Sequence, residues 1–359
     1  MSGFKVAVLG ATGAVGREMI GVLEERDFPV DELVPLASAR SEGEKLEFGG
    51  GEVTVHEVSA KAFAGCDLAL FSAGAQVSRQ WASIAAAQGA YVIDNSSAFR
   101  GESDIPLVVP EVNPDTVSLA DKRRIIANPN CSTIQMVVAL KPLHDAAGLR
   151  RIVVSTYQAV SGKGQKGIDE LEKQISDLMN CREATSSAFV HRIAFNVIPH
   201  IDDFAEDGSG CTKEEMKMVN ETRRILDIPD LPVSATCVRV PLFFGHSESV
   251  NAAFGEPLSP EEARTLLRRA PGVKVLDDPA NNIYPMPMLA SGDTAVHVGR
   301  IRADRSQTNG LDMFICADNL RKGAALNAVQ IAELLVKKGM LPGGGHHDCG
   351  CGEHCRHGG

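Results

Sequence analysis

The sequence predicts an α/β protein with a doubly wound, Rossmann-type domain and a second, α+β domain built on a mixed sheet. Three observations support this prediction. A short apolar run near the N-terminus enters a glycine-rich turn and then a helical pattern, and similar strand–helix alternation continues to about residue 128. Longer strand patterns follow. The 359 residues also exceed what one ordinary core accommodates, so two domains are expected.

Composition narrows the class of protein. Hydrophobic residues make up 44% and charged residues 23%, which is typical of a globular chain. The net charge of −10 argues against a nucleic-acid partner, and an anionic substrate would therefore need local basic pockets. We expect no membrane partner, because no apolar run reaches the length of a membrane span and the N-terminus lacks a signal-peptide pattern. Nine scattered cysteines suit a reducing compartment, so the expected location is cytoplasmic.

The N-terminal turn predicts a nucleotide site. A buried strand at 5–9 runs into Gly10, and glycines recur at 13 and 16 before a helix. Such a turn lets backbone N–H groups approach a pyrophosphate at the helix N-terminus. Because the G-x-x-G-x-x-G spacing is a variant of the usual fingerprint, a tight turn without a ligand is the alternative.

The loop after the next strand, at 33–37, indicates which nucleotide binds. An NAD site would carry an acidic residue there, whereas this chain has Ser38, Arg40 and Ser41. Hydroxyl groups and a guanidinium suit a 2′-phosphate, which favours NADP over NAD. An ordinary polar loop is the alternative interpretation.

Further polar residues follow predicted strands at 67–71 and 91–94. Ser72 follows the first strand, and Asn95 and Arg100 follow the second. Ligands of open α/β sheets lie beyond the carboxyl ends of strands, so Arg100 is a candidate anion-binding residue. A solvated surface arginine is the alternative.

Cys131 is the candidate nucleophile. The segment 128–133 (Asn-Pro-Asn-Cys-Ser-Thr) lies between a strand pattern and an apolar helical pattern, which places Cys131 at a helix start. The unpaired N–H groups and the dipole there favour a thiolate, the nucleophilic form of cysteine. The alternative is a small buried hydrophobic residue.

The second domain is expected over residues 129–320, with long strands at 233–240, 249–254, 294–301 and 311–317. A helix at 322–338 is expected to return to the first domain. The predicted division is therefore 1–128 with 321–341 for the NADP-binding domain, 129–320 for the catalytic and dimerisation domain, and 342–359 for a flexible tail.

Polar residues of the second domain supply more candidates. His246 follows the strand that bears Arg239 and could act as acid and base beside Cys131, although a structural histidine is the default. Thr212 and Glu215 form a capping-box pattern. That pattern leaves Glu214 and Lys217 together on the adjoining helix face, where an isolated surface ion pair is the alternative.

Together these motifs resemble bacterial aspartate-β-semialdehyde dehydrogenase over nearly the whole chain, from Lys5 to about Leu341. The resemblance is carried by the stretches 10–16, 96–100, 128–133, 158–164, 214–217, 237–249 and 327–331. It implies that Cys131 carries the acyl group, that His246 is the general acid and base, and that Gln158 orients the acyl intermediate. It also implies that Arg239 binds the substrate carboxylate and Glu214 the ammonium, while Arg100 and Lys217, with Asn95, bind phosphate.

For the cofactor, the resemblance implies NADP. It assigns the pyrophosphate to Gly10, Thr12, Gly13, Ala14 and Val15, and the 2′-phosphate to Ser38, Arg40 and Ser41. The resemblance assigns the nicotinamide side to Ser72, Ser161, Gly162, Asn327 and Gln330. A homodimer, which can pair into a tetramer, is also implied.

The implied reaction is reduction of 4-phospho-L-aspartate by NADPH to L-aspartate 4-semialdehyde and phosphate, in the synthesis of lysine, diaminopimelate, methionine and threonine. N-acetyl-γ-glutamyl-phosphate reductase is an alternative, but it prefers a Pro-Gly-Cys-Tyr-like turn. Glyceraldehyde-3-phosphate dehydrogenase fits the nucleophile turn and cofactor less well. A regulator that binds NADP without catalysis is the alternative from another class.

The C-terminal tail predicts an accessory zinc site that catalysis does not need. Its seven soft or borderline ligands lie in a short glycine-rich span, and tetrahedral zinc takes four such donors. The alternative is a disordered tail that binds metal only adventitiously. The candidate ligands are His346, His347, Cys349, Cys351, His354, Cys355 and His357.

Overall fold

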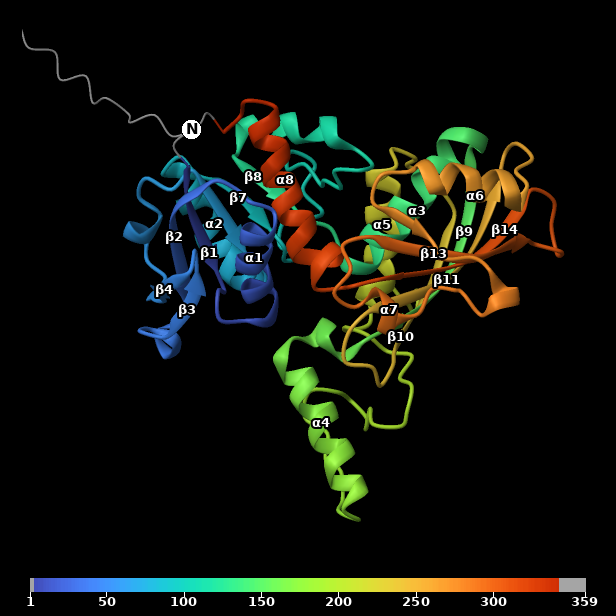
Figure 1. Cartoon of the computed structure of the whole chain (residues 1–359), viewed down its shortest axis with the longest axis horizontal. Helices are drawn as coiled ribbons and strands as arrows, with labels where there is room; N and C mark the ends of the chain where they lie inside the picture. Colours follow the sequence, from blue (N-terminus) through green and yellow to red (C-terminus); the bar gives the residue numbers. More distant parts are fainter. Residues whose placement is uncertain (1–2, 342–359) are drawn as a thin grey trace, which may run out of the picture.

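The computed structural model describes residues 3–341, which form two sheets with their helices and the small hairpin β3–β4 (Figure 1). The first sheet has six parallel strands in the order β5-β2-β1-β6-β7-β8. This is the strand order of a doubly wound dinucleotide-binding fold. The strands are β1 (Phe4–Leu9), β2 (Val30–Ala37), β5 (His56–Glu57), β6 (Leu68–Phe71), β7 (Tyr91–Asp94) and β8 (Ile125–Ala127), and the hairpin is β3 (Lys45–Phe48) with β4 (Gly51–Thr54).

Helices cover both faces of the first sheet, which explains why its strands are apolar on both sides. α1 (Ala14–Glu25) and α8 (Leu326–Lys337) pack on one face, in a core shared with Val6, Val8 and Ile93. α2 (Ala75–Ala87) packs on the other face, against Ala69 and Phe71. The short 3₁₀ helices of this half are Ala39–Ser41, Ala60–Phe63 and Pro114–Lys122.

The first turn requires its glycines. Gly10 has a φ of +89°, and a Cβ at this position would lie 2.7 Å from the Ser72 carbonyl oxygen. A Cβ at Gly16 would collide with the Gly10 carbonyl oxygen. These glycines therefore allow α1 to start close to the ends of β1 and β6.

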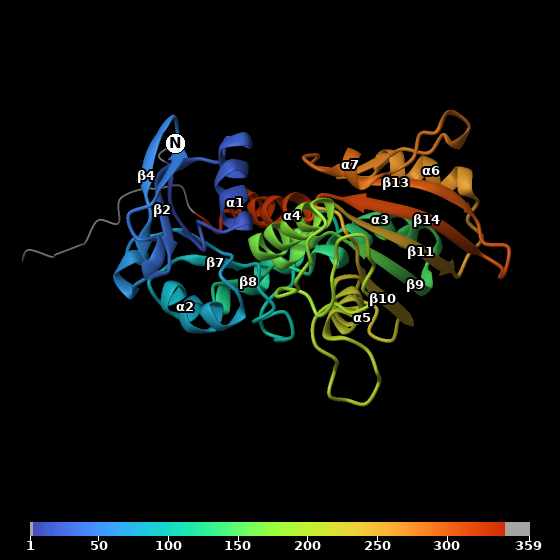
Figure 2. The same ribbon diagram turned by 90° about the horizontal axis from the view of Figure 1, so that it is seen from below.

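The second sheet is mixed, in the order β10-β9-β11-β14-β13-β12, with parallel pairs only at its two edges. Its helices α3, α5 and α6 cover one face (Figure 2). The strands are β9 (Leu149–Gln158), β10 (Val233–Arg239), β11 (His246–Phe254), β12 (Val273–Val275), β13 (Val296–Ala303) and β14 (Gly310–Ala317). The helices are α3 (Cys131–Ala147), α4 (Gln165–Met179), α5 (Lys213–Ile225), α6 (Pro260–Arg269) and α7 (Pro287–Ala290), with 3₁₀ turns at Val160–Lys163 and Pro279–Asn281.

The opposite face of the second sheet is more open. Ser249 of β11 is exposed, and it pairs with Ser155 and Phe314 on the neighbouring strands. The Tyr157 and Phe314 rings lie 6.2 Å apart on this face, with Tyr157 37% exposed. α4 projects away from both sheets (Figure 1).

The chain returns to the first sheet through a π-helical turn, Arg321–Ala325, that leads into α8. Lys322 in this turn is fully buried, and its ammonium group bonds to Glu111 at 2.6 Å, Gln330 at 2.7 Å and Asn327 at 2.9 Å. A buried ammonium group is tolerated because each of its three N–H groups has an acceptor.

The fold class expected from the sequence is confirmed, with two local differences. The strand expected from Ser249 begins at His246, so this histidine is the first residue of β11. The helix expected from residue 322 opens as a π turn. Between residues 3 and 341, none of the helices combines the length and apolar character needed to cross a membrane. The proposed domain boundaries stay a prediction.

Candidate active site

A cavity of about 710 Å³ is lined by residues that follow strands of the first sheet and by residues of the second sheet and its helices. Its lining includes the turn before α1, the loops after β6 and β7, the start of α3 and the ends of β9 and β10. Most of the candidate residues meet here, although they come from distant parts of the sequence. Those that line it are Gly13, Ala14, Val15, Ser72, Asn95, Arg100, Cys131, Gln158, Ser161, Gly162, Glu214, Lys217, Arg239 and His246.

Cys131 is the first residue of α3, as expected, and Asn130 is the N-cap. The Asn130 side-chain oxygen accepts hydrogen bonds from the backbone N–H groups of Ser132 at 3.0 Å and Thr133 at 3.3 Å. A Cβ on Gly323 would lie 2.8 Å from the Cys131 Cβ, so only glycine fits there without displacement. The nucleophile is therefore held by its own helix cap and by the chain's return to the first domain.

The sequence-based expectation of a thiolate at Cys131 is wrong for the ligand-free cavity. Burial, together with the nearby Glu214 carboxylate, raises the pKa of the Cys131 thiol to about 11. The charges of Arg100 and Arg239 lower this pKa, but not enough to offset burial. Desolvation of the charged form therefore outweighs the effect of the helix N-terminus.

His246 is fully buried, and burial lowers its pKa to about 3, with a further contribution from Arg239. The Ala159 backbone N–H donates to Nδ1 at 3.1 Å. A ring nitrogen that accepts this bond carries no proton, so the neutral ring holds its proton on Nε2. Nε2 is buried, and residues 3–341 offer it no hydrogen-bond partner. It can therefore donate to an oxygen of a ligand.

Gly162 allows the backbone to lie close to the Arg239 and His246 side chains. A Cβ at this position would lie 2.8 Å from the Arg239 Nη1 and 3.2 Å from the His246 Nε2. Asn319 fixes the same turn, since its side-chain amide donates to the Ser161 hydroxyl at 3.0 Å and its oxygen accepts from the Gly245 N–H at 2.9 Å. The unpartnered His246 Nε2 fits a polar ligand group in the cavity that Cys131 also lines.

Two buried charged residues can orient a substrate. Arg239 is 5% exposed, and its Nη1 donates a hydrogen bond to the Ala159 carbonyl oxygen at 2.6 Å. Its other guanidinium donors are available for a carboxylate. Burial alone would raise the pKa of Glu214, but the Lys217 ammonium and hydrogen bonds from Gln158 and Asn130 hold this pKa at about 2. Glu214 is therefore a carboxylate that can attract a cation.

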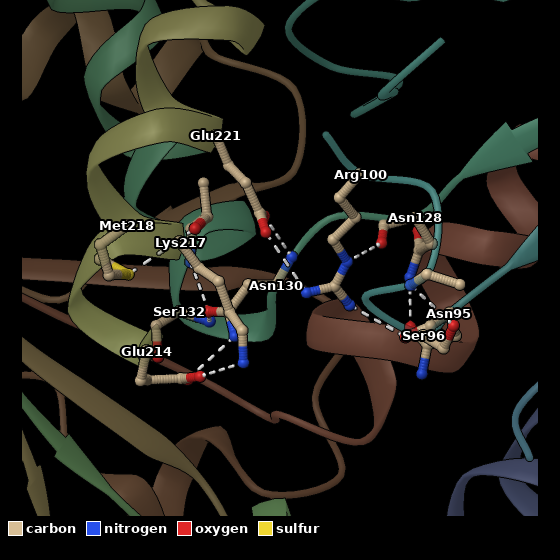
Figure 3. A network of polar contacts seen from close by, with 12 residues as sticks. Asn95, Ser96, Arg100, Asn128, Asn130, Ser132, Glu214, Lys217, Met218 and Glu221 are labelled. Carbon is tan, nitrogen blue, oxygen red and sulfur yellow. Dashed lines mark hydrogen bonds and ion pairs between the residues drawn. The ribbon is translucent and has the colours of Figure 1, made fainter. Parts of the chain in front are cut away.

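Arg100, Asn95 and Lys217 lie around Asn130 in one polar network (Figure 3). Arg100 donates to the backbone oxygens of Asn128 at 2.8 Å and Asn95 at 2.9 Å. Lys217 pairs with Glu214 at 3.0 Å and with Asp202 at 2.7 Å. The expected capping box of α5 is confirmed, and it leaves the Glu214–Lys217 pair directed toward the cavity rather than toward solvent.

The cofactor candidates of the glycine turn and of the loop after β2 that remain do not line the cavity. The Thr12 and Ser41 hydroxyls lie 3.3 Å apart, which brings the loop after β2 beside the glycine turn. Ser38 and Arg40 are exposed on this loop. Gly10 lies at the base of the turn and does not line the cavity.

Asn327 and Gln330 are not among the residues that line the cavity, and their expected place beside the nicotinamide stays a prediction. Asn327 is fully buried and bonds to Val108, Asn128 and Lys322. Gln330 bonds to Glu111 and Lys322. Their polar atoms are taken up by the network that anchors α8.

Sequence reasoning missed Asn319 and Gly323, which line the cavity just before α8. It also missed the cap Asn130, although an asparagine directly before a helix is a signal that could have revealed it. Within residues 3–341, no group of three or more His, Cys, Asp or Glu could hold a metal ion. The proposed zinc ligands in the tail lie outside the described residues.

Comparison with known proteins identifies the family. The model described as "Semialdehyde dehydrogenase, NAD binding domain" matches residues 5–120, and "Semialdehyde dehydrogenase, dimerisation domain" matches residues 140–322. The aspartate-semialdehyde dehydrogenase of Aquifex aeolicus is 58% identical over 94% of this chain and all of its own length. The chain belongs to the aspartate-semialdehyde dehydrogenase family.

Solved structures of aspartate-semialdehyde dehydrogenases share the architecture. The Vibrio cholerae enzyme II, complexed with ASA, is 50% identical with a TM-score of 0.91, covering 94% of this chain and 99% of that one. The Candida albicans enzyme with NADP is 26% identical with a TM-score of 0.71, covering 94% of this chain and all of its own. The alternative families are not favoured.

The pKa of Cys131 provides a test of the site's electrostatics. Because Glu214 contributes to the raised pKa, replacing its charge in Glu214→Gln should shift the midpoint of Cys131 alkylation to lower pH. Mass spectrometry of ligand-free protein treated with iodoacetamide over the alkaline range measures this midpoint. Glu172→Gln on α4 is the control and should match the unmodified chain. An alkylation midpoint in Glu214→Gln that is unchanged or lies at higher pH would show that Glu214 does not raise the pKa of Cys131.

Proposed function

We propose that this chain reduces 4-phospho-L-aspartate to L-aspartate 4-semialdehyde and phosphate with NADPH, through a thioester on Cys131. The single observation that carries the proposal is the convergence of Cys131, His246, Gln158 and Arg239 on one cavity. Membership of the aspartate-semialdehyde dehydrogenase family supports the substrate class. The reaction is reversible and can be followed in either direction.

In the reductive direction the Cys131 sulfur attacks the acyl carbon of the phosphorylated substrate and phosphate leaves. The thiol is protonated at rest, and its proton leaves with the departing phosphate group as the C–S bond forms and the C–O bond to phosphate breaks. His246 presents an Nε2–H, which donates a hydrogen bond to the developing oxyanion. Gln158 is buried beside Glu214, with 3.0 Å between Nε2 and Oε1, and orients the acyl group.

Substrate selection follows from the buried charges. Glu214 accepts bonds from Asn130, Gln158 and Lys217, which occupy three of its roughly four acceptor positions. The fourth position accepts the substrate ammonium group. Arg239 binds the α-carboxylate, while Arg100 and Lys217, with Asn95, bind the phosphate. N-acetyl-glutamate semialdehyde carries no ammonium group, so this site disfavours it.

NADP is the proposed cofactor, and when bound it supplies or accepts the hydride. Gly13, Ala14 and Val15 offer the helix N-terminus to the pyrophosphate, with Gly10 and Thr12 completing the turn. Ser38, Arg40 and Ser41 bind the 2′-phosphate. Ser72, Ser161 and Gly162 hold the nicotinamide beside Cys131. The NADP complex of the Candida albicans relative supports this choice.

The open face of the second sheet, with Tyr157, Ser249 and Phe314, is the proposed surface of a homodimer, and pairing of dimers would form a tetramer. A matching dimerisation-domain model supports association of subunits. We place the enzyme in the cytoplasm, in the synthesis of lysine, diaminopimelate, methionine and threonine.

The proposed chemistry depends on the Cys131 sulfur. Cys131→Ala should lose turnover completely while NADP binding is retained, because the nucleophile and the nucleotide turn are separate. The assay measures NADPH formed from aspartate semialdehyde, phosphate and NADP⁺, and cofactor binding is measured by calorimetry. Cys181→Ala, on an exposed cysteine, is the control. Activity of Cys131→Ala near the unmodified rate would refute the proposal.

The two anion sites should separate in kinetics. Arg239→Leu should raise the KM for aspartate semialdehyde by about 100-fold or more with a small effect on phosphate, since a bidentate charged contact is lost. Arg100→Leu should show the reverse pattern. N-acetyl-glutamate semialdehyde, assayed alongside, should be the poorer substrate by about 100-fold or more. Equal effects of both variants on both constants would show that the sites are wrongly divided.

The exposed arginine after β2 should set cofactor choice. Arg40→Ala should erode the preference for NADP over NAD about tenfold or more, because the 2′-phosphate loses a charged partner. The ratio of kcat/KM for the two cofactors measures this effect. Arg79→Ala on α2 is a control, and a ratio unchanged in Arg40→Ala would remove Arg40 from the cofactor site.

A further inference from the structure

Two buried carboxylates on α5 converge on the residue that precedes Cys131. Glu214 and Glu221 are seven residues apart, so they share one helix face, and they are 6% and 4% exposed. Glu214 accepts a hydrogen bond from the Asn130 side-chain amide at 2.9 Å. Glu221 accepts one from the Asn130 backbone N–H at 2.6 Å. Figure 3 shows both carboxylates directed from α5 toward Asn130.

The Asn130 backbone N–H needs this acceptor. It lies ahead of α3, where the helix's own hydrogen bonds do not reach it, and its surroundings are buried. A buried N–H that loses its only partner costs about 1–3 kcal/mol. The turn can avoid that cost only by moving. Since Cys131 is the next residue, such a movement would displace its sulfur.

The second oxygen of Glu221 faces Arg100. Glu221 Oε1 lies 3.4 Å from Arg100 Nη1, while Arg100 Nε and Nη2 donate to the Asn128 and Asn95 carbonyl oxygens. Of the five guanidinium N–H groups, one on Nη1 and one on Nη2 remain for a ligand. Arg100 lines the cavity, whereas Glu221 lies behind it and is not part of the lining.

We propose that Glu221 is a positioning residue that joins the nucleophile turn to the phosphate-binding arginine through the two oxygens of one carboxylate. This inference rests on the proposed roles of Cys131 and Arg100. Burial raises the pKa of Glu221, and Arg100 opposes that shift, as expected for a carboxyl group that lies between an amide and a guanidinium.

The roles of the two Glu221 carboxylate oxygens can be tested separately. Glu221→Gln keeps an oxygen acceptor for the Asn130 N–H but removes the charge that compensates Arg100. Arg100 should then attract a phosphate dianion more strongly. Glu221→Leu removes the acceptor as well, so the turn should loosen and the attacking sulfur should lose its alignment.

Hydrogen–deuterium exchange of the peptide that spans residues 128–133 reports on the turn without turnover. Protection should stay at the unmodified level in Glu221→Gln and fall in Glu221→Leu. In kinetics, Glu221→Gln should lower the KM for inorganic phosphate about threefold or more with kcat within about twofold. Glu221→Leu should lower kcat about tenfold or more, since displaced reacting groups lose that much.

Glu215→Gln is the matched control on the same helix. Glu215 also accepts a hydrogen bond from a backbone N–H, that of Cys237 at 3.0 Å, but within residues 3–341 it forms no hydrogen bond or ion pair with Asn130 or Arg100. It should leave the exchange of residues 128–133 and the phosphate KM unchanged. An effect of this control equal to that of the Glu221 variants would show general destabilisation and overturn the inference.

Unchanged phosphate KM in Glu221→Gln would also overturn the inference, as would full protection and full kcat in Glu221→Leu. If Glu221→Leu does not fold, the Gln variant decides alone. Failure of the proposed function would be recognised by results other than those that overturn the inference about Glu221. It would show as activity of Cys131→Ala or as a normal phosphate KM in Arg100→Leu, whatever the exchange measurements give.

Discussion

The site depends on the way Asn130 is held. Its side-chain oxygen caps α3, its side-chain amide bonds to Glu214, and its backbone N–H bonds to Glu221. One residue therefore connects the start of the nucleophile helix to α5. A residue with this many obligatory partners has few alternative positions, so Cys131 is placed before any substrate arrives.

Burial dominates the electrostatics of the cavity. It keeps Cys131 as a thiol and His246 as a neutral ring, while Glu214 stays ionised because Lys217 and two amides compensate it. The free protein therefore does not hold a thiolate–imidazolium pair.

Residues without a catalytic role build much of this geometry. Lys322, Asn327 and Gln330 anchor the final helix, and that anchoring sets Gly323 against Cys131. The side chains of Asn327 and Gln330 form their hydrogen bonds within this scaffold. Asn319 and Gly323, a few residues earlier, reach the cavity.

Local patterns in the sequence were sufficient for several features. The glycine turn, the start of α3 at Cys131 and the capping box of α5 follow from propensities and steric rules that act over a few residues. The expected role of Arg239 came from resemblance, and that of His246 from its place after the strand of Arg239 together with resemblance, since neither residue has a local signature of its own.

Only the tertiary structure decided the rest. Glu221 lies 91 residues from Asn130, and no short pattern records that contact. The pKa of Cys131 depends on the burial of the whole cavity, so reasoning from the helix N-terminus alone gave the wrong sign. Asn327 lies one turn beyond Gly323, and the rotation of that turn directs it away from the cavity. Desolvation and packing are set by all the surrounding chain, whereas turns and caps are set by neighbours in sequence.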